Sequence, residues 1–426
     1  MIRLTAAQPE LLRLLGERGG ALTAGEAASR TGLSLELVER QLLELAVAVG
    51  ASLRVSDDGS VAYHFPRHLW RRLLARSWRL RLGATLNWLW RQSTRLVRLV
   101  IGTLLTLLAL LLVTGLMVTG RIPASAEFLK AMAGLLLHVV LGVGDSVAGL
   151  ARGRRRQHDD PVALQRQKAI QDDLELLESL FSVLFGDGDP NRNLEQRRWR
   201  RIGCFIAHRG GAVIAEDLAP LLDLPRRPAD GERAGEIADA AMLPVLLRFD
   251  GRPEVSEQGE FAYHFPSLQV CSGLAKPAHG RGQALAADRP SPPLRERRCV
   301  FSRASSDVRW AYAVLSGALL LLAPMLFDIL RTTPPLLAGL AWFSIGYALL
   351  LIAIPLLRLA ALRWRNRPIV ERNSLRTGWA RSASSPTGRL DRKRSFARSF
   401  ARHRHLGTDG LAYTTEKGML EQEIES

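Results

Sequence analysis

The chain has 426 residues, a formal net charge of +17, 47% hydrophobic residues and a mean hydropathy of +0.03. This length allows two to four domains, and the composition indicates soluble parts mixed with more apolar segments. The three cysteines, Cys204, Cys271 and Cys299, lie far apart and include no CxxC pair. Their spacing argues against a disulfide framework and gives no cluster-ligand signature.

One phrase occurs twice in the chain. Residues 55–66 read VSDDGSVAYHFP and residues 255–266 read VSEQGEFAYHFP, while RGGA stands upstream of each at 18–21 and 209–212. The offset between the copies is 191 residues at RGGA and 200 residues at AYHFP. The pattern indicates a duplicated unit whose second copy has about nine extra residues, which the loop RRPADGERA accommodates.

Each copy predicts helices followed by a two-stranded hairpin, which is the plan of a winged helix. In the first copy, apolar residues recur at helical spacing over 37–49, after a turn and N-cap at 31–34. A strand at 53–55, a turn at 57–59 and an alternating strand at 61–65 then form the wing.

Aromatic residues are the predicted inward-facing anchors of the two wings. These anchors are Tyr63, Phe65, Tyr263 and Phe265. His64 and His264 alternate with them and are assigned outward strand positions, because no Cys, Asp or second His lies at metal-ligand spacing.

Apolar stretches predict membrane spans, since a crossing helix needs about 20 apolar residues. The candidates are 99–120, 131–151, 310–327 and 336–357. The second is the weakest, because it contains His138 and Asp145, which pair inside the membrane, lie at an interfacial helix end or mark an ion path. The predicted fold class is mainly α, with tandem winged-helix (α+β) cytoplasmic modules that are each followed by a transmembrane helical hairpin.

Basic residues gather beside the apolar stretches. Residues 67–98 hold nine Arg and no acid, and residues 358–405 have a net charge of +12. The loops inside the hairpins are poor in Lys and Arg, as expected for loops that face away from the cytoplasm. No signal-peptide pattern begins at Met1. We therefore expect a multi-pass protein of a bacterial inner or thylakoid membrane, with its modules and both termini cytoplasmic.

These boundaries divide the chain into eight segments. They are module 1 (1–66), a basic juxtamembrane segment (67–98), hairpin 1 (99–151), an amphipathic helix with a GDGDPN turn (152–192), module 2 (193–266), a linker (267–306), hairpin 2 (307–357) and a basic tail with an acidic C-terminus (358–426).

The juxtamembrane segment interleaves Arg with Trp. Such a pattern can bind single-stranded nucleic acid by stacking. Here it leads into a predicted span, where Trp and Arg settle at lipid head groups. The predicted lipid-interface residues are Trp70, Trp78, Trp88, Trp90, Arg91, Arg95 and Arg98.

An amphipathic helix is predicted at 162–185, where it packs on module 2 or the bilayer or binds another protein. The turn after it has calcium-loop spacing at Asp187, Asp189 and Asn191. Arg192 and Arg198 stand where such a loop needs Gly and an acid, so a turn and helix N-cap explain the motif better. The basic tail is a candidate for contact with lipid phosphate or RNA.

The modules are expected to bind protein rather than DNA. The third helix of a winged helix usually enters the major groove. In the first copy this helix carries Glu36, Glu39 and Glu44 beside Arg40 and Gln41, and residues 1–66 have a net charge of −2, which would repel a duplex. No GxSxG, phosphate-binding glycine loop, HExxH or carboxylate pair occurs, so we predict no enzyme, cofactor or metal site.

The twin AYHFP wings, LFGDGDPN at 184–191 and YTTEK at 413–417 resemble an uncharacterised membrane protein family of cyanobacteria and plastids with duplicated winged-helix units. Plant members are labelled iron–sulphur cluster biosynthesis family proteins, although the three cysteines lack the usual ligand spacing. We expect an integral membrane scaffold or assembly factor whose modules bind proteins and whose flanks bind membrane lipids. The alternatives are a membrane-tethered DNA-binding transcription regulator and a transporter component that uses His138 and Asp145.

Overall fold

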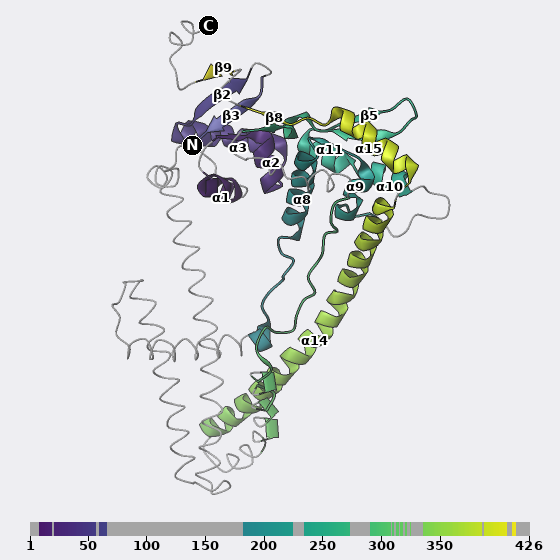
Figure 1. Cartoon of the computed structure of the whole chain (residues 1–426). Coiled ribbons are helices and arrows are strands. Elements are labelled where there is room, and N and C mark those ends of the chain that lie inside the picture. Colours follow the sequence, from purple (N-terminus) through teal and green to yellow (C-terminus); the bar gives the residue numbers. More distant parts are fainter. Residues whose placement is uncertain are drawn as a thin grey trace, which may run out of the picture. The chain divides into compact units, whose positions relative to one another are not determined.

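The computed structural model describes much of the two repeated copies and of the C-terminal region (Figure 1). The described residues are 8–18, 21–56, 59–65, 182–224, 234–272, most of 290–324, 335–385, 387–406 and 411–414. They fall into two compact units. The first takes its described residues from Met1–Arg81, Asn191–Arg297 and Pro368–Ser426, and the second from Leu82–Pro190 and Arg298–Arg367.

Module 1 belongs to the first unit. Its elements are α1 (Gln8–Arg18), β1 (Ala21–Thr23), α2 (Ala24–Thr31), α3 (Leu35–Val49), β2 (Ser52–Ser56) and β3 (Val61–His64). Thr23 caps α2, because its hydroxyl oxygen accepts a hydrogen bond from the backbone N–H of Glu26 at 3.2 Å. Gly32 and Gly50 end α2 and α3 in the left-handed conformation, with φ of 74° and 70°, which glycine adopts without strain.

Module 2 follows the same order in the same unit. Its elements are α8 (Leu194–His208), β4 (Ala212–Val213), α9 (Ala215–Leu218), the 3-10 turn η1 (Ala219–Leu221), α10 (Ala234–Ala240), α11 (Leu243–Phe249), β5 (Arg252–Val255) and β6 (Phe261–His264). The residues that correspond to α3 are divided between α10 and α11. Pro244 lies in the first turn of α11, where its missing N–H costs no helical hydrogen bond.

The two sheets have the same register. His64 of β3 lies opposite Ala21 and Ser52, and His264 of β6 lies opposite the corresponding residues of β4 and β5. Both hairpins turn at a glycine with positive φ, Gly59 at 80° and Gly259 at 74°. The repeated phrase is therefore the sequence of one strand-and-turn unit used twice.

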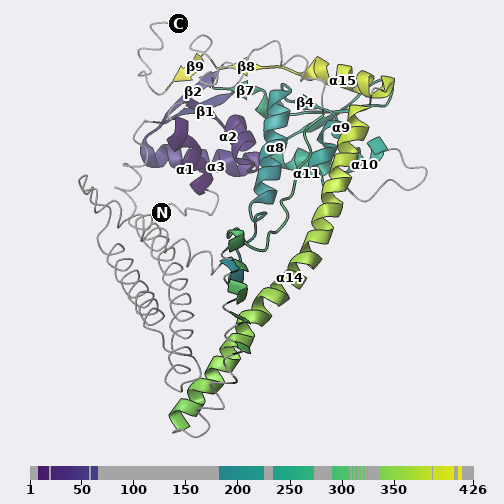
Figure 2. The ribbon, with the colours of Figure 1, turned by 60° about the horizontal axis from the view of Figure 1, so that its bottom comes forward.

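The two modules share one hydrophobic core. Figure 2 shows α8 of module 2 beside α2 of module 1. The helices approach closely at Gly203, where a Cβ atom would lie 2.7 Å from the Cα of Ser29. The Cys204 thiol donates to the carbonyl of Ser29 at 3.4 Å, and the Arg248 Nε donates to the carbonyl of Gly32 at 2.9 Å. The modules thus form one folded body.

The C-terminal region returns to both modules. The elements involved are η2 (Pro266–Leu268), β7 (Val270–Cys271), α14 (Pro335–Ser384), α15 (Gly388–Phe400), β8 (Arg404–His405) and β9 (Leu411–Thr414). α15 packs on β4 and β6 of module 2, and β8 pairs in parallel with β7. β9 then extends the module 1 sheet to the order β1-β3-β2-β9, while the module 2 sheet has the order β4-β6-β5.

The predicted transmembrane architecture is wrong. Within the described part of the chain, no helix combines the length and the apolar character that crossing a membrane requires. The predicted span at 336–357 is only the first part of α14, which continues without a break through seven Arg residues at 358–381. The hydropathy pattern identified the apolar run, but it did not predict that the run continues into a charged part of the same helix.

The fold class and localisation change accordingly. The described chain is a mixed helix and sheet structure with small sheets, not a mainly α protein with transmembrane hairpins. The prediction of a multi-pass integral membrane protein fails with the hairpins on which it was based. Hairpin 1 (99–151) and the juxtamembrane segment (67–98) lie outside the described residues.

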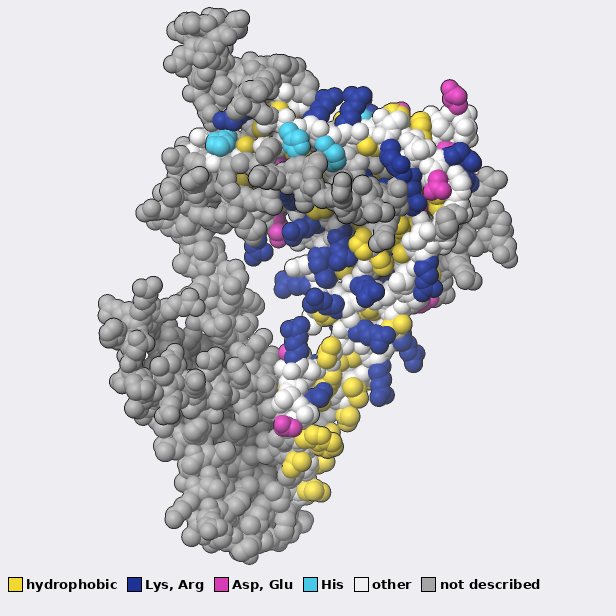
Figure 3. Space-filling model, viewed as in Figure 1, with side chains coloured by type: hydrophobic (Ala, Val, Ile, Leu, Met, Phe, Trp, Pro, Cys, Tyr) yellow, Lys and Arg dark blue, Asp and Glu magenta, His cyan; other side chains and the backbone are white. Residues whose placement is uncertain are grey.

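Within the second unit, an arginine of α14 binds backbone carbonyl groups of other segments. The Arg358 guanidinium donates to the carbonyls of Ser182, Val183 and Phe301 at 3.2, 2.5 and 2.6 Å. Figure 3 shows Arg side chains along α14 in dark blue, with apolar side chains toward its N-terminal end. Arg358, which was predicted to flank a membrane span, therefore holds other parts of the polypeptide.

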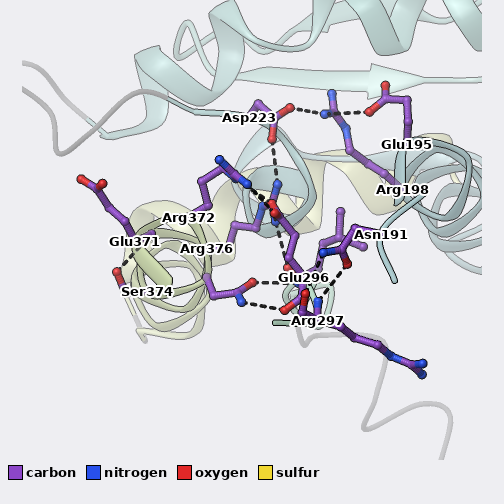
Figure 4. Close-up of polar contacts among 12 residues, drawn as sticks. Asn191, Glu195, Arg198, Asp223, Glu296, Arg297, Glu371, Arg372, Ser374 and Arg376 are labelled. Carbon is purple, nitrogen blue, oxygen red and sulfur yellow. Dashed lines mark hydrogen bonds and ion pairs between the residues drawn. The ribbon is translucent and has the colours of Figure 1, made fainter. Parts of the chain in front are cut away.

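In the first unit, Glu296 attaches to α14 through a buried carboxylate (Figure 4). It accepts hydrogen bonds from Arg372 at 2.8 and 2.6 Å and from Arg376 at 2.8 Å. Arg376 also binds Asp223 at 3.0 Å, and Arg198 binds the other oxygen of that carboxylate. Burial acts to raise the pKa of Glu296, but the hydrogen bonds from Arg372 and Arg376 outweigh it and lower the pKa below its usual value.

Amide side chains bind the backbone of the extended segment beside α14 that contains Glu296 and Arg297. Asn373 accepts from the N–H of Glu296 and donates to its carbonyl, both at 2.9 Å. Asn191 binds the N–H and carbonyl of Arg297 in the same way, at 2.9 and 2.7 Å. An amide group offers one acceptor and a donor, so it satisfies both backbone groups without reading the side chain. These contacts bind the segment through its backbone, in the way that a protein can bind an extended peptide.

The Glu296 contacts predict acid sensitivity. A carboxylate whose pKa is lowered on folding contributes stability that is present above its unfolded pKa of about 4.3 and is lost as the pH falls through the folded pKa. The unfolding midpoint of the wild type in denaturant should therefore fall as the pH is lowered below about 4.3. Glu296→Gln should show a shallower fall, whereas the exposed control Glu257→Gln should keep the wild-type slope. Equal slopes for all three proteins would contradict the prediction.

The close approach of α2 and α8 predicts opposite effects for two helical glycines. Gly203→Ala should destabilise the protein by about 1–3 kcal/mol, because the methyl group meets the backbone of Ser29. Gly378→Ala in α14 should stabilise it by up to about 1 kcal/mol, since no atom lies within 4 Å of the added Cβ. Denaturant unfolding of both variants measures the difference. Similar effects of the two substitutions would show that helix propensity alone decides.

Candidate functional site

The best-defined binding surface of the described chain is the place where α15 docks on module 2. Lys393 of α15 has only 1% of its side chain exposed, and its Nζ atom lies 2.8 Å from the Glu216 carboxylate and 3.3 Å from that of Asp239. Asp239 also accepts a hydrogen bond from the Tyr263 hydroxyl at 3.0 Å. A buried cation needs paired acids, so these contacts fix the position of α15.

A second cation and an apolar contact complete the surface. Arg394 donates to Asp217 at 2.8 Å and to the carbonyl of Ala383 at 2.7 Å. Ala397 packs in a small apolar cluster with Ile214 of module 2. Beyond these contacts, the Gln269 amide donates to the carbonyls of Phe400 and Gly210, which ties the end of α15 to module 2.

The acids of this surface are perturbed by burial. Desolvation raises the pKa of Asp239, although the Lys393 charge opposes the increase. Desolvation likewise raises the pKa of Asp217 against the hydrogen bond from Arg394. Burial and the Asp239 carboxylate both raise the pKa of Tyr263, so its hydroxyl stays protonated. The acidic side chains of this surface face the cationic residues of α15.

Module 1 has an open pocket at the corresponding place. The pocket has a volume of about 530 Å³ and is lined by residues of β1, α2, α3 and the hairpin, with Ser267 and Val270 on another side. Glu39 and Tyr63 face it and correspond to Asp239 and Tyr263. Partial burial raises the pKa of Glu39, and the carboxylates of Asp250 and Glu36 raise it further.

Both α3 and α11 expose apolar residues. Leu43 and Val47 of α3 are 52% and 77% exposed, and Leu243 and Leu247 of α11 are 61% and 77% exposed. The two pairs occupy corresponding positions at the offset of 200. Exposed apolar residues at matching positions of both modules are typical of interaction surfaces.

The aromatic residues of the wings are buried. Tyr63, Phe65, Tyr263 and Phe265 are 8%, 2%, 4% and 0% exposed, and all belong to the shared core. His64 and His264 are half-buried, and the His264 ring packs 5.8 Å from the ring of Phe400. The strand alternation thus places the histidines on the face of the sheet that α15 covers in module 2.

Other predicted site residues lie outside the described residues. They are Trp70, Trp78, Trp88, Trp90, Arg91, Arg95, Arg98, His138 and Asp145, together with residues 162–181 of the amphipathic helix. Residues Asp187 and Asp189 of the GDGDPN turn are described, and they bind the backbone N–H of Arg303 and the guanidinium of Arg365. Among the described residues, no group of three or more His, Cys, Asp or Glu side chains could hold a metal ion.

The residues that matter most at the α15 surface were not identified from sequence. Lys393 and Arg394 were part of a basic tail expected to meet lipid phosphate or RNA. Glu216 and Asp217 are not among the predicted site residues. The available signal was the repeat itself, because Glu39 and Asp239 put an acid at the same position of each copy.

Together these features define a protein of tandem helix-and-hairpin modules that bind segments of their own chain. No family model matches the sequence, and no solved structure matches it. The chain is 31% identical over 440 residues to the Arabidopsis thaliana protein described as "Uncharacterized protein At5g03900, chloroplastic". The match covers 96% of this chain and 79% of the plant protein. The chain therefore belongs to the same family as this chloroplast protein.

The buried cation of α15 predicts a large effect on stability. Lys393→Ala should destabilise the protein by about 3–5 kcal/mol, because Glu216 and Asp239 would remain buried without their partner. Arg392→Ala is the matched control, since the Arg392 side chain is 60% exposed and its distance of 3.8 Å from Glu260 is long for an ion pair. It should cost no more than about 1 kcal/mol. Urea unfolding measures both values, and equal losses would contradict the special role of Lys393.

Proposed function

We propose that the chain is a non-enzymatic scaffold or assembly factor whose modules bind segments of other proteins. The observation that carries this proposal is the docking of the C-terminal region on both modules. α15 binds module 2 through Lys393, which is 177 residues from its partner Glu216, and β9 adds a strand to the sheet of module 1. Helix docking and strand addition are general modes of peptide recognition, so a segment of another protein can make the same contacts.

The third helices support protein binding over DNA binding. A helix in the major groove presents Arg, Lys, Asn or Gln to base edges. The exposed face of α3 instead presents Glu36, Glu39, Leu43 and Val47 beside a single Arg40. A DNA-binding regulator is the alternative with less support. The transporter alternative has none in the described residues, since both of its residues lie outside them.

We also propose that the chain acts in a cyanobacterium or a plastid, as its sequence motifs indicate. The support is the plant relative, which is described as chloroplastic. The iron–sulphur label of the resemblance is not part of the proposal. Cys204 lies in α8, Cys271 in β7 and Cys299 in the extended segment beside α14, so no observation favours a shared ligand role.

The proposal is tested by changing the exposed apolar face of both third helices. The double variant Val47→Glu with Leu247→Glu, purified as the tagged full chain after cross-linking, should lose specific co-purifying proteins that the wild type retains. Both residues are 77% exposed, so the fold should be kept, which circular dichroism and the unfolding midpoint check. Val314→Glu, at a 67% exposed position outside the modules, is the matched control and should retain them.

Two outcomes would overturn this function. Recovery of the same proteins by the double variant would exclude the third-helix face as the binding surface. Selection of one DNA sequence by the full chain from a random pool, at physiological salt, would favour the regulator. Salt-sensitive binding without sequence preference is expected for any chain of this positive charge.

A further inference from the structure

The pocket of module 1 corresponds to the part of module 2 that holds Lys393. The strand registers of the two sheets are the same, and the helices follow in the same order. The corresponding positions are Thr23 and Ile214, Gly25 and Glu216, Glu39 and Asp239, Ser60 and Glu260, and Tyr63 and Tyr263. In module 2 each of these residues contacts α15 or a side chain that does so. In module 1 the same positions line the pocket.

The acid at the centre of this surface has its counterion in only one module. In module 2, Asp239 pairs with Lys393. In module 1, the Glu39 carboxylate makes no hydrogen bond or ion pair with any residue that the structure describes. The charges of Asp250 and Glu36 both raise the pKa of Glu39, and Arg40, which also lines the pocket, is exposed and pairs with Glu44 at 3.6 Å. The pocket therefore favours a cation.

We propose that the module 1 pocket binds a basic helix of a partner protein and that a lysine of this helix pairs with Glu39. The inference rests on the proposed function, and it specifies the chemistry of one partner. The helix lies over the pocket as α15 lies over module 2, with its apolar residues against Leu35, Leu43 and Val61 at the rim.

The differences between the modules favour a single lysine. Gly25 replaces Glu216, and a Cβ atom there would collide with the carbonyl oxygen of Ser267, so η2 covers the place of the second acid. One carboxylate then faces the pocket beside the Tyr63 hydroxyl. An ammonium group is a compact point charge that suits one carboxylate, whereas a guanidinium is best used by two parallel hydrogen bonds.

The chain itself supplies the probe. A fluorescent peptide of residues 387–402 carries the α15 sequence, and its binding to the full chain is measured by fluorescence anisotropy. Glu39→Gln should weaken binding by about two- to fivefold, as expected for loss of a partly exposed ion pair. Glu257→Gln, an exposed acid in the turn of the module 2 hairpin, is the matched control and should bind as the wild type does.

A double-mutant cycle assigns the lysine. A peptide with Lys393→Ala should bind the wild type more weakly but should lose nothing further on Glu39→Gln, because both changes remove the same pair. Equal binding by wild type and Glu39→Gln would overturn the proposal, as expected if the peptide merely exchanges with α15 on module 2. A dimer of the wild type that Glu39→Gln dissociates, seen by light scattering, would assign the pocket to a second copy and also overturn it.

The two proposals can fail separately. Loss of co-purifying proteins on changing Val47 and Leu247, together with no effect of Glu39→Gln on the peptide, would keep the scaffold function and reject the lysine pocket. Neither of those two residues lines the pocket, so the experiments do not share a substitution.

Discussion

Burial of Lys393 against Glu216 and Asp239 is the constraint on which the arrangement of the C-terminal region depends. A lysine with 1% of its side chain exposed is tolerated only where acids compensate its charge. The pairing fixes α15 on module 2, and this position places the following residues beside β7. From there the chain reaches β2 of module 1, where β9 joins the sheet. The C-terminal region thus contacts module 2 through α15 and module 1 through β9.

Duplication followed by divergence explains why two similar modules have different surfaces. The frame is retained, because the buried aromatic residues and the strand registers are the same in both copies. The surface residues have changed at a few positions. Gly25 admits the η2 backbone, whereas Glu216 supplies an acid for α15. The residue at this position therefore contacts the η2 backbone in module 1 and a side chain of α15 in module 2.

The positive charge of the chain is used partly inside the fold. Arg358, Arg372 and Arg376 of α14 bind backbone carbonyls or buried acids of the polypeptide. Charge density along the sequence could not reveal this use, because the acids that pair with these residues are distant in the chain. Glu296 and Arg372, for example, are separated by 76 residues. A run of arginines next to an apolar stretch has the same appearance in sequence whether it meets lipid or protein.

The sequence by itself determined the local elements of the modules. The AYHFP repeat, the glycines of the hairpin turns and the helical spacing before them are local features, so they specify strands, turns and helices without reference to distant residues. It also indicated correctly that the chain is related to plastid proteins. Only the tertiary structure showed that the apolar run 336–357 belongs to the long charged helix α14. It alone also decided the docking of α15 and the identity of the buried ion pairs. The physical reason is that burial and pairing depend on segments far apart in the chain, such as Glu296 and Arg372 at 76 residues and Glu216 and Lys393 at 177 residues. A hydropathy window or a charge count contains no information about contacts over that distance.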